Sequence, residues 1–108
     1  MSHVTTHVLD AALGRPAAGI AVALHDARGV ELATGVTDAD GRVPDLGPDA
    51  LPSGDYRLVF ETARYFAAAR RDTFYPRVTI DFTLADESSH YHVPVLLSPF
   101  AYSTYRGS

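Results

Sequence analysis

Hydrophobic and polar residues alternate with a period of two along most of this chain, and turn-forming residues interrupt the alternation about every ten positions. Such alternation is typical of β-strands that bury one face, since successive side chains of a strand point to opposite sides of its sheet. Short strands separated by regular turns favour a β-sandwich or barrel. The stretches that carry the pattern are residues 3–10, 20–26, 30–37, 56–61, 78–84 and 91–97.

One stretch, residues 62–71, departs from the alternation and predicts a short helix. It contains four alanines, which are strong helix formers, and Thr62 is a suitable N-cap. Residues 44–54 hold three prolines and two glycines and predict a loop. Turns are expected at residues 14–16 and 38–41, where Gly-Arg-Pro and Asp-Ala-Asp-Gly occur. In the second turn the glycine would adopt a positive φ and the aspartates would hydrogen-bond the local backbone.

The first and last of these strands carry histidines on the face opposite their valines. In the first strand His7 is followed on the same face by Leu9. In the last strand His92 is followed by Pro94 and Leu96. A face that combines histidines with large apolar side chains is not expected to meet water alone. We expect another copy of the chain to cover it.

The composition limits where a functional site can lie. With 108 residues, of which 46% are hydrophobic and 20% charged, the chain predicts a single domain, residues 1–108, with one core. A cleft large enough for catalysis would take up much of so small a core. An active site, if the protein is an enzyme, is therefore expected to need a second subunit.

Charge and cysteine usage exclude several classes of function. The nine basic residues are all arginine and face thirteen acidic ones, so the net charge of −4 offers no basic footprint for nucleic acid. The absence of cysteine excludes disulfides and thiolate metal sites. Residues 1–6 show neither a basic nor an apolar signal segment, and no apolar run approaches about 18 residues. We expect a cytoplasmic protein with no membrane partner.

The five histidines are the first candidates for acid–base chemistry, because histidine alone changes charge near neutral pH without help. His3 and His25 are interpreted as surface polar residues. His90 and His92 are two positions apart and share one strand face, which could bind zinc, but a metal site would need a third ligand. No nucleophile elbow, phosphate loop or dinucleotide fingerprint is present.

Two signatures and a final tetrapeptide give the chain a family resemblance. Residues 7–10 (His-Val-Leu-Asp) with 14–17 (Gly-Arg-Pro-Ala) resemble the first signature of the transthyretin family. Residues 90–94 (His-Tyr-His-Val-Pro) with 97–104 (Leu-Ser-Pro-Phe-Ala-Tyr-Ser-Thr) resemble the second. Residues 105–108 (Tyr-Arg-Gly-Ser) are the tetrapeptide that separates the 5-hydroxyisourate hydrolase branch from the hormone-carrying transthyretins. The resemblance runs in register over essentially the whole chain.

The resemblance implies a fold, an activity and an assembly. The fold would be an all-β, prealbumin-like β-sandwich of two four-stranded sheets with one short α-helix. The activity would be hydrolysis of 5-hydroxyisourate to 2-oxo-4-hydroxy-4-carboxy-5-ureidoimidazoline in urate degradation, without cofactor or metal. The assembly would be a homotetramer, a dimer of dimers, with its sites at the dimer–dimer interface. The implied site residues are His7, Arg42, His92, Tyr105 and Ser108.

Each site residue has a chemical role that suits such a hydrolysis. One histidine, His7 or His92, would activate water as a neutral base, and the sequence leaves open which of them does so. Arg42 would hold the oxygen-rich ring and its developing oxyanion. The other histidine, hydrogen-bonded to the Ser108 hydroxyl or to the terminal carboxylate, would orient the water and shuttle the proton. Tyr105 would contact the substrate. Two alternatives remain: a transthyretin-like carrier of a small ligand without turnover, and a monomeric, purely structural sandwich.

Overall fold

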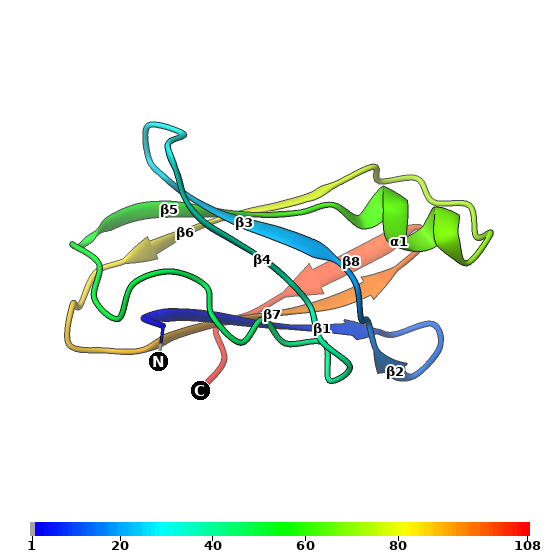
Figure 1. Cartoon of the computed structure of the whole chain (residues 1–108), viewed down its shortest axis with the longest axis horizontal. Coiled ribbons are helices and arrows are strands. Elements are labelled where there is room, and N and C mark those ends of the chain that lie inside the picture. The colour runs from blue at the N-terminus through cyan, green and yellow to red at the C-terminus, as the bar shows by residue number, and fades with distance from the viewer. Residues whose placement is uncertain (1) are drawn as a thin grey trace.

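The alternating stretches form the strands of two β-sheets in the computed structural model, which describes residues 2–108. The two sheets lie as two layers with the helix at one end (Figure 1). In chain order the elements are β1 (Val4–Asp10), β2 (Arg15–Pro16), β3 (Ala21–Asp26), β4 (Glu31–Val36), β5 (Gly54–Phe60), α1 (Thr62–Ala68), β6 (Val78–Leu84), β7 (Tyr91–Ser98) and β8 (Ala101–Thr104).

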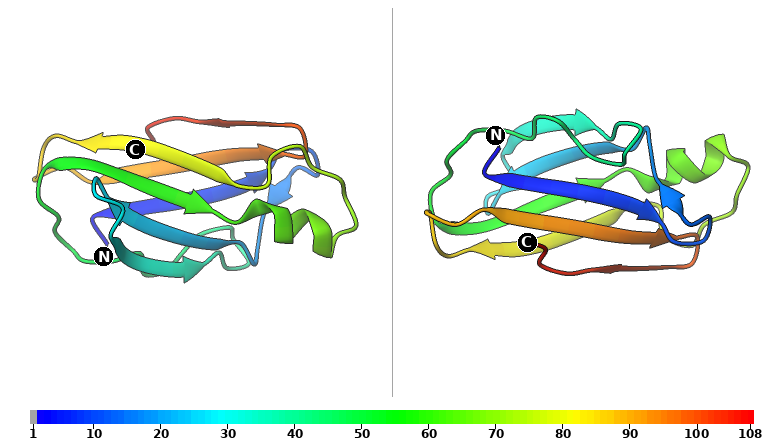
Figure 2. Two further views of the ribbon diagram at one scale, coloured as in Figure 1. Left: turned by 90° about the horizontal axis from the view of Figure 1, so that it is seen from above. Right: turned by 90° about the horizontal axis from the view of Figure 1, so that it is seen from below.

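Each sheet has four strands, in the orders β2-β1-β7-β8 and β4-β3-β5-β6. All neighbouring strands are antiparallel except β1 and β7, which run parallel although they come from opposite ends of the chain. Figure 2 shows this pair at the centre of its sheet. The predicted sandwich of two four-stranded sheets with one short helix is confirmed.

The core lies between the two sheets and is filled by the inward residues of each strand. In β1 the valines at positions 4 and 8 are fully buried, and Phe66 of α1 closes one end with 1% of its surface exposed. Burial of this kind stabilises the fold by roughly 1.5–3 kcal/mol for each large side chain. The largest buried side chains are Ile20, Leu24, Leu46, Leu58, Phe60, Phe66, Leu84 and Leu97. The core therefore leaves no room for a site, which must lie on an outward face.

Three local predictions were wrong in detail: a turn, the end of the helix and its N-cap. Residues 14–16 are not all turn: Gly14 has a φ of 70°, but Arg15 and Pro16 form β2, which pairs with the end of β1. The helix ends at Ala68 because Arg70 adopts a φ of 54°, and a left-handed residue cannot continue a right-handed helix. Its N-cap is Glu61, and Thr62 is buried with no partner for its hydroxyl group.

His3 was expected at the surface and is instead buried, with 6% of its surface exposed. Its Nε2–H donates to the Ser89 carbonyl at 2.7 Å, and its Nδ1 accepts from the Leu51 N–H at 2.9 Å. The expectation failed because the loop at residues 44–54 folds over the start of β1. His3 therefore joins two loops and has no free nitrogen for chemistry.

Asp10, at the end of β1, is a fully buried charge that the alternation did not single out. Its carboxylate accepts hydrogen bonds from Tyr65 Oη at 2.7 Å, from Arg71 Nη1 at 2.7 Å and from the Leu13 N–H at 2.9 Å. Burial raises the pKa of this carboxyl group, but the hydrogen bonds, that of Arg71 first, outweigh burial and lower the pKa to about 2. The cluster ties α1 and the segment after it to β1.

No helix within residues 2–108 is long and apolar enough to cross a membrane. The cytoplasmic location stays a prediction.

Candidate active site

The parallel pairing of β1 and β7 brings the sequence-predicted histidines onto one outward face. The register sets Thr5 beside His92 and His7 beside Pro94. Because side chains alternate along a strand, these four share the face that points away from the core. Thr5, His7 and His92 are each half-buried. The two histidines implied by the resemblance thus lie on adjacent strands of the same surface.

Arg42 is fixed to this face by the turn at residues 38–41. Asp38 Oδ1 accepts hydrogen bonds from the backbone N–H groups of Asp40 at 2.9 Å and of Arg42 at 3.0 Å, as the sequence predicted for this turn. Gly41 has a φ of 78°, and a Cβ atom there would collide with the Val8 carbonyl oxygen. The close approach lets the Val8 N–H donate to the Gly41 carbonyl at 2.8 Å.

The same approach pairs His7 and Arg42 in an isolated antiparallel bridge. A glycine at position 41 is therefore what allows the arginine to lie against β1.

The end of the chain returns along the outer side of β7 and brings Ser108 to the face that carries His92. Gly107 forms a bridge with His92, and its N–H donates to the His92 carbonyl at 2.8 Å. A Cβ atom at Gly107 would lie only 2.6 Å from His92 Cδ2, so the tail packs closely on that imidazole. Figure 2 shows the C-terminus over the outer side of β7. The tail also buries Pro94, so part of the outward apolar face is covered by the chain itself.

Together these segments line an open groove, called here the histidine groove. Its lining residues are Thr5, Thr6, Asp38, Arg42, Val43, Pro44, His90, His92 and Ser108. His7 lies at its margin through its bridge to Arg42.

Hydrogen bonding leaves several groups of the groove available for a ligand. His92 Nδ1 lies 2.8 Å from the Thr5 hydroxyl oxygen. Within residues 2–108, His92 Nε2, the His7 ring and the Arg42 guanidinium have no hydrogen-bond or ion-pair partner. Half-buried polar groups are normally paired, so the unpaired nitrogens of His7 and His92 indicate a binding or catalytic site, and the exposed Arg42 adds a positive charge beside them.

The electrostatics of the groove keep one histidine neutral. Burial, followed by the positive charge of Arg42 and the neighbouring His7 and His90, lowers the pKa of His92 below its ordinary value of 6.5. Both effects disfavour a cation at this position. His92 is therefore an uncharged imidazole at neutral pH, as a general base must be.

Tyr105 lies apart from the other predicted site residues. It is 58% exposed and lines a second hollow at the open edge between β6 and β8, which includes His92 but neither Arg42 nor Ser108. Next to it, the Arg106 guanidinium sits 4.3 Å above the centre of the Tyr91 ring. The structure thus brings four of the five predicted residues together and leaves Tyr105 on the other side of His92.

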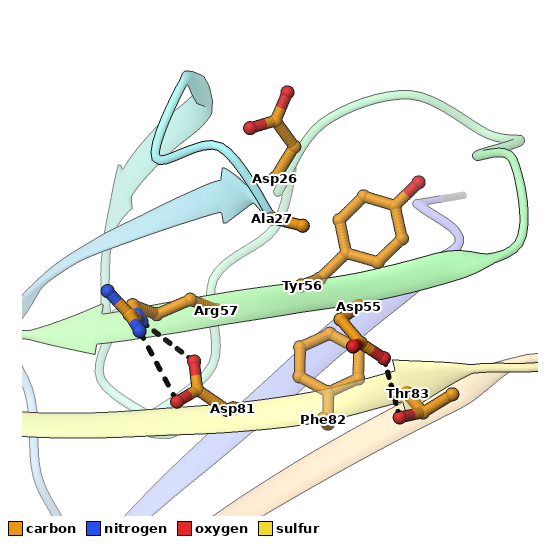
Figure 3. A pocket seen from close by; sticks show the side chains of 8 residues that line it. All are labelled: Asp26, Ala27, Asp55, Tyr56, Arg57, Asp81, Phe82 and Thr83. Carbon is orange, nitrogen blue, oxygen red and sulfur yellow. Dashed lines mark hydrogen bonds and ion pairs between the residues drawn. The ribbon is translucent and has the colours of Figure 1, made fainter.

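A third hollow, on the outward face of β5 and β6, holds three carboxylates but no free charge (Figure 3). Arg57 donates to Asp81 at 2.7 Å, and Thr83 donates to Asp55 at 2.7 Å. Asp26 accepts from the backbone of its own turn. Since each carboxylate is already satisfied locally, this hollow is not a candidate for catalysis.

The sequence did not reveal the part that Thr5 plays. Its hydroxyl oxygen lies 2.8 Å from His90 Nε2 and 2.8 Å from His92 Nδ1, so one nitrogen of each histidine faces Thr5. Within residues 2–108 no group of three or more histidine and carboxylate side chains is placed to hold a metal ion. The only available signal was that Thr5 precedes His7 by two positions and so shares its face.

Comparisons with known proteins show which family the chain belongs to and which solved structures share its fold. The model of the HIUase/Transthyretin family matches residues 4–107. The chain is 44% identical to the 5-hydroxyisourate hydrolase of Salmonella typhimurium over 97% of its own length and 80% of the relative. Its fold is similar to the structure of Klebsiella pneumoniae 5-hydroxyisourate hydrolase, with a TM-score of 0.90, 42% identity, and coverage of 100% of this chain and 94% of the other.

It is also similar to transthyretin from Sparus aurata, with a TM-score of 0.91, 33% identity, and coverage of 99% and 97% of the two chains.

Proposed function

The chain belongs to the HIUase/transthyretin family, and from this premise we propose that the histidine groove is its active site, where it hydrolyses 5-hydroxyisourate. The product is 2-oxo-4-hydroxy-4-carboxy-5-ureidoimidazoline, and the reaction belongs to purine degradation. The observation that carries this proposal is that a neutral imidazole, His92, and a guanidinium with no ion-pair partner in the described part of the chain, Arg42, line one groove on an outward face.

The reaction adds water to a ring carbonyl and then breaks an amide-like C–N bond. His92 suits the first step, because its Nε2 has no partner within residues 2–108 and its lowered pKa keeps it neutral. General base catalysis of this kind contributes about 10²- to 10⁴-fold in rate. The same nitrogen can return the proton to the leaving ring nitrogen as the C–N bond breaks.

Arg42 suits the binding of the substrate and of its developing negative charge. It is permanently charged and can give two parallel hydrogen bonds to neighbouring oxygens. No carboxylate of residues 2–108 competes for it as an ion-pair partner. Pre-organised donors aimed at an oxyanion are commonly the largest electrostatic contribution to such reactions.

His7, Ser108 and Tyr105 complete the proposed site. His7 lies next to Arg42 and would hydrogen-bond the substrate ring or the attacking water. Ser108 lines the groove, and within residues 2–108 its hydroxyl has no hydrogen bond to a histidine or to any other group, so it would bind the substrate or the water from the side of the tail. Tyr105, beyond His92, is proposed to contact substrate from the edge of the sandwich.

We further propose that the protein is a homotetramer, a dimer of dimers, with each groove covered by a neighbouring dimer. Half-buried Leu9 and Leu96 continue the outward face beyond the histidines, and the chain's own tail covers only the region near Pro94. A second copy on this face would remove the remaining apolar surface from water and enclose the substrate.

Freshly generated 5-hydroxyisourate provides the direct test, because its ultraviolet absorbance falls as the ring opens. We expect the decay rate to rise in proportion to a catalytic amount of protein. A transthyretin-like carrier would instead bind the compound in a fixed ratio and leave the decay rate unchanged, and that result would contradict the proposal. A sizing column run beside the assay tests the tetramer, and the mass of a single chain would contradict that part.

A further inference from the structure

A chain of three hydrogen-bonded side chains runs along the outward face, from His92 through Thr5 to His90. The Thr5 hydroxyl oxygen lies 2.8 Å from His92 Nδ1 and 2.8 Å from His90 Nε2. His90 and His92 point to the same side because they are two positions apart, and the register of β1 and β7 sets Thr5 directly beside His92. Thr5 is β-branched and therefore restricted in χ1. The three groups hold one another in place without a ligand.

The number of hydrogen atoms available in this hydrogen-bonded row of three side chains restricts which group donates to which. A hydroxyl group has one hydrogen, so Thr5 can donate to only one of its two imidazole neighbours. The other imidazole must donate its own N–H to the Thr5 oxygen. In one arrangement His92 carries its proton on Nδ1 and leaves a lone pair on Nε2. In the other it carries the proton on Nε2 and has no base to offer the groove.

We propose that Thr5 and His90 are positioning residues, with His90 accepting the Thr5 hydroxyl proton and Thr5 accepting the Nδ1 proton of His92, so that His92 Nε2 is the base. The reaction that this base serves rests on the proposed function. The inference also distinguishes the two site histidines, since the His7 ring has no partner within residues 2–108 to fix its proton. A base held by a second group and that group by a third is the usual way to orient an imidazole.

The proton count of the hydrolysis is consistent with this arrangement. As the water oxygen bonds to the ring carbon, its proton moves to His92 Nε2, and His92 becomes an imidazolium ion. Its Nδ1–H continues to donate to Thr5, and the Thr5 O–H continues to donate to His90. Each bond of the chain strengthens as positive charge develops on His92. The proton on Nε2 then passes to the leaving nitrogen as the C–N bond breaks, which restores the starting state.

Protonation of His90 would reverse the direction of the hydrogen bonds between His90, Thr5 and His92. A doubly protonated His90 can only donate, so Thr5 would turn its hydrogen toward His92 Nδ1 and leave the His92 proton on Nε2. His90 is exposed and can take this proton from solvent. The charged and titratable groups around His90 and His92 are Arg42, His7, Asp38, the end of the chain at Ser108, and Arg106, which donates to the His90 carbonyl at 3.4 Å. Activity should therefore require both His90 and His92 to be neutral.

The tautomer of His92 can be measured without any turnover. Side-chain ¹⁵N chemical shifts of His92 near pH 8 should show the proton on Nδ1 in the unmodified protein. In Thr5→Val, which keeps the shape of the side chain and removes its hydroxyl, the Nδ1–H fraction should fall. A proton on Nε2 in the unmodified protein would overturn the inference, and this holds even if 5-hydroxyisourate proves not to be the substrate.

Turnover gives a second, independent measurement. Thr5→Val should lower kcat at least about tenfold and change KM less than about twofold, because the hydroxyl orients the base and its one hydrogen is already donated to His90. Thr5→Ser retains the hydroxyl group and should recover kcat to within about threefold of the unmodified protein. Equal kcat values for the valine and unmodified proteins would contradict the inference.

The pH profile tests the role of His90. Protonation of His90 and protonation of His92 would each inactivate the unmodified protein. As the pH falls, its kcat should therefore decrease more steeply than a single protonation would produce. His90→Gln cannot titrate, and its acid limb should follow a single protonation. If His90 were only a nearby positive charge, the acid limb of the kcat profile would be no steeper in the unmodified protein than in the variant. That result would contradict a positioning role for His90.

Discussion

The outward faces of the two sheets carry charged and polar groups in opposite ways. On β5 and β6, Arg57 and Asp81 lie 2.7 Å apart and satisfy each other in solvent. On β1 and β7, the His92 Nε2 and the Arg42 guanidinium have no partner within residues 2–108. Both faces are held by regular strand pairing, so their rigidity does not distinguish them. The difference lies in whether the polar groups are satisfied by one another or remain free for a ligand.

Replacing the proposed base should produce the largest difference in kcat between variants of the two outward faces. His92→Asn is expected to lower kcat for 5-hydroxyisourate at least about 100-fold, the usual scale for loss of a general base. His25→Asn is the matched control, since His25 is half-buried on β3 of the other sheet, with its Nε2 3.9 Å from Glu31. Activity of His92→Asn within threefold of the unmodified protein would remove His92 from the mechanism. If His7→Asn lowered kcat more than His92→Asn does, His7 would be the base and His92 the residue that orients the substrate or the water.

The two arginines offer a matched pair for the next test. Arg42→Gln should lower kcat/KM by about 50-fold, because a permanently charged donor to the substrate is lost. Arg57→Gln should change kcat/KM less than about twofold and the free energy of unfolding by no more than about 1 kcal/mol, as expected for an exposed ion pair. Similar effects of the two changes on turnover would erase the distinction between the faces.

Acid should lower the free energy of unfolding by protonating Asp10, which is buried and paired with Arg71. The pKa of Asp10 is lowered to about 2 in the folded protein from its ordinary 3.8, so folding is stabilised when this carboxyl is ionised. That contribution, about 2 kcal/mol, is complete above pH 4 or so and is lost as the pH falls toward about 2. Unfolding by urea between about pH 5 and pH 2 measures it, with Asp10→Asn as reference. A variant with the same acid dependence would contradict the assignment to Asp10.

Loss of the last residue should have the smallest effect on turnover. Deletion of Ser108 is expected to lower kcat about tenfold by removing a hydroxyl group from the groove. The melting temperature should stay constant, because Ser108 is exposed and makes no hydrogen bond within residues 2–108. Ser103→Ala, on the exposed strand β8, is the control. Unchanged kcat in the deletion variant would place Ser108 outside the site.

The sequence predicted the elements best where the alternation was uninterrupted. Residues 78–84 form β6 with the expected bounds, because inward Val78, Ile80 and Leu84 can bury only as a strand. The helix was predicted three residues too long, since no local pattern shows that Arg70 would adopt a left-handed conformation. Thr62 failed as an N-cap because the packing of α1 turned its side chain toward the core.

The site was predictable only in part. The alternation placed His7 and His92 on outward faces, and the Asp-Gly turn indicated a fixed position for Arg42, but their meeting depends on which strands pair. Thr5 and His92 are separated by 87 positions, and no local signal sets their register. The contact of Thr5 with His90 follows from that register and was invisible for the same reason. The roles of the site residues in catalysis remain predictions that the variants above can test.

The parallel pairing of β1 with β7 also has a consequence for folding kinetics. In the other sheet, β3 pairs with β4 and β5 with β6, and each pair is consecutive in the chain, whereas β1 and β7 meet only after a long loop has closed. Pairings distant along the chain form slowly, since the entropy of loop closure is lost before the contacts are gained. During refolding, we expect enzymatic activity to return later than strand content. Its recovery time would then report when the two ends of the chain come together.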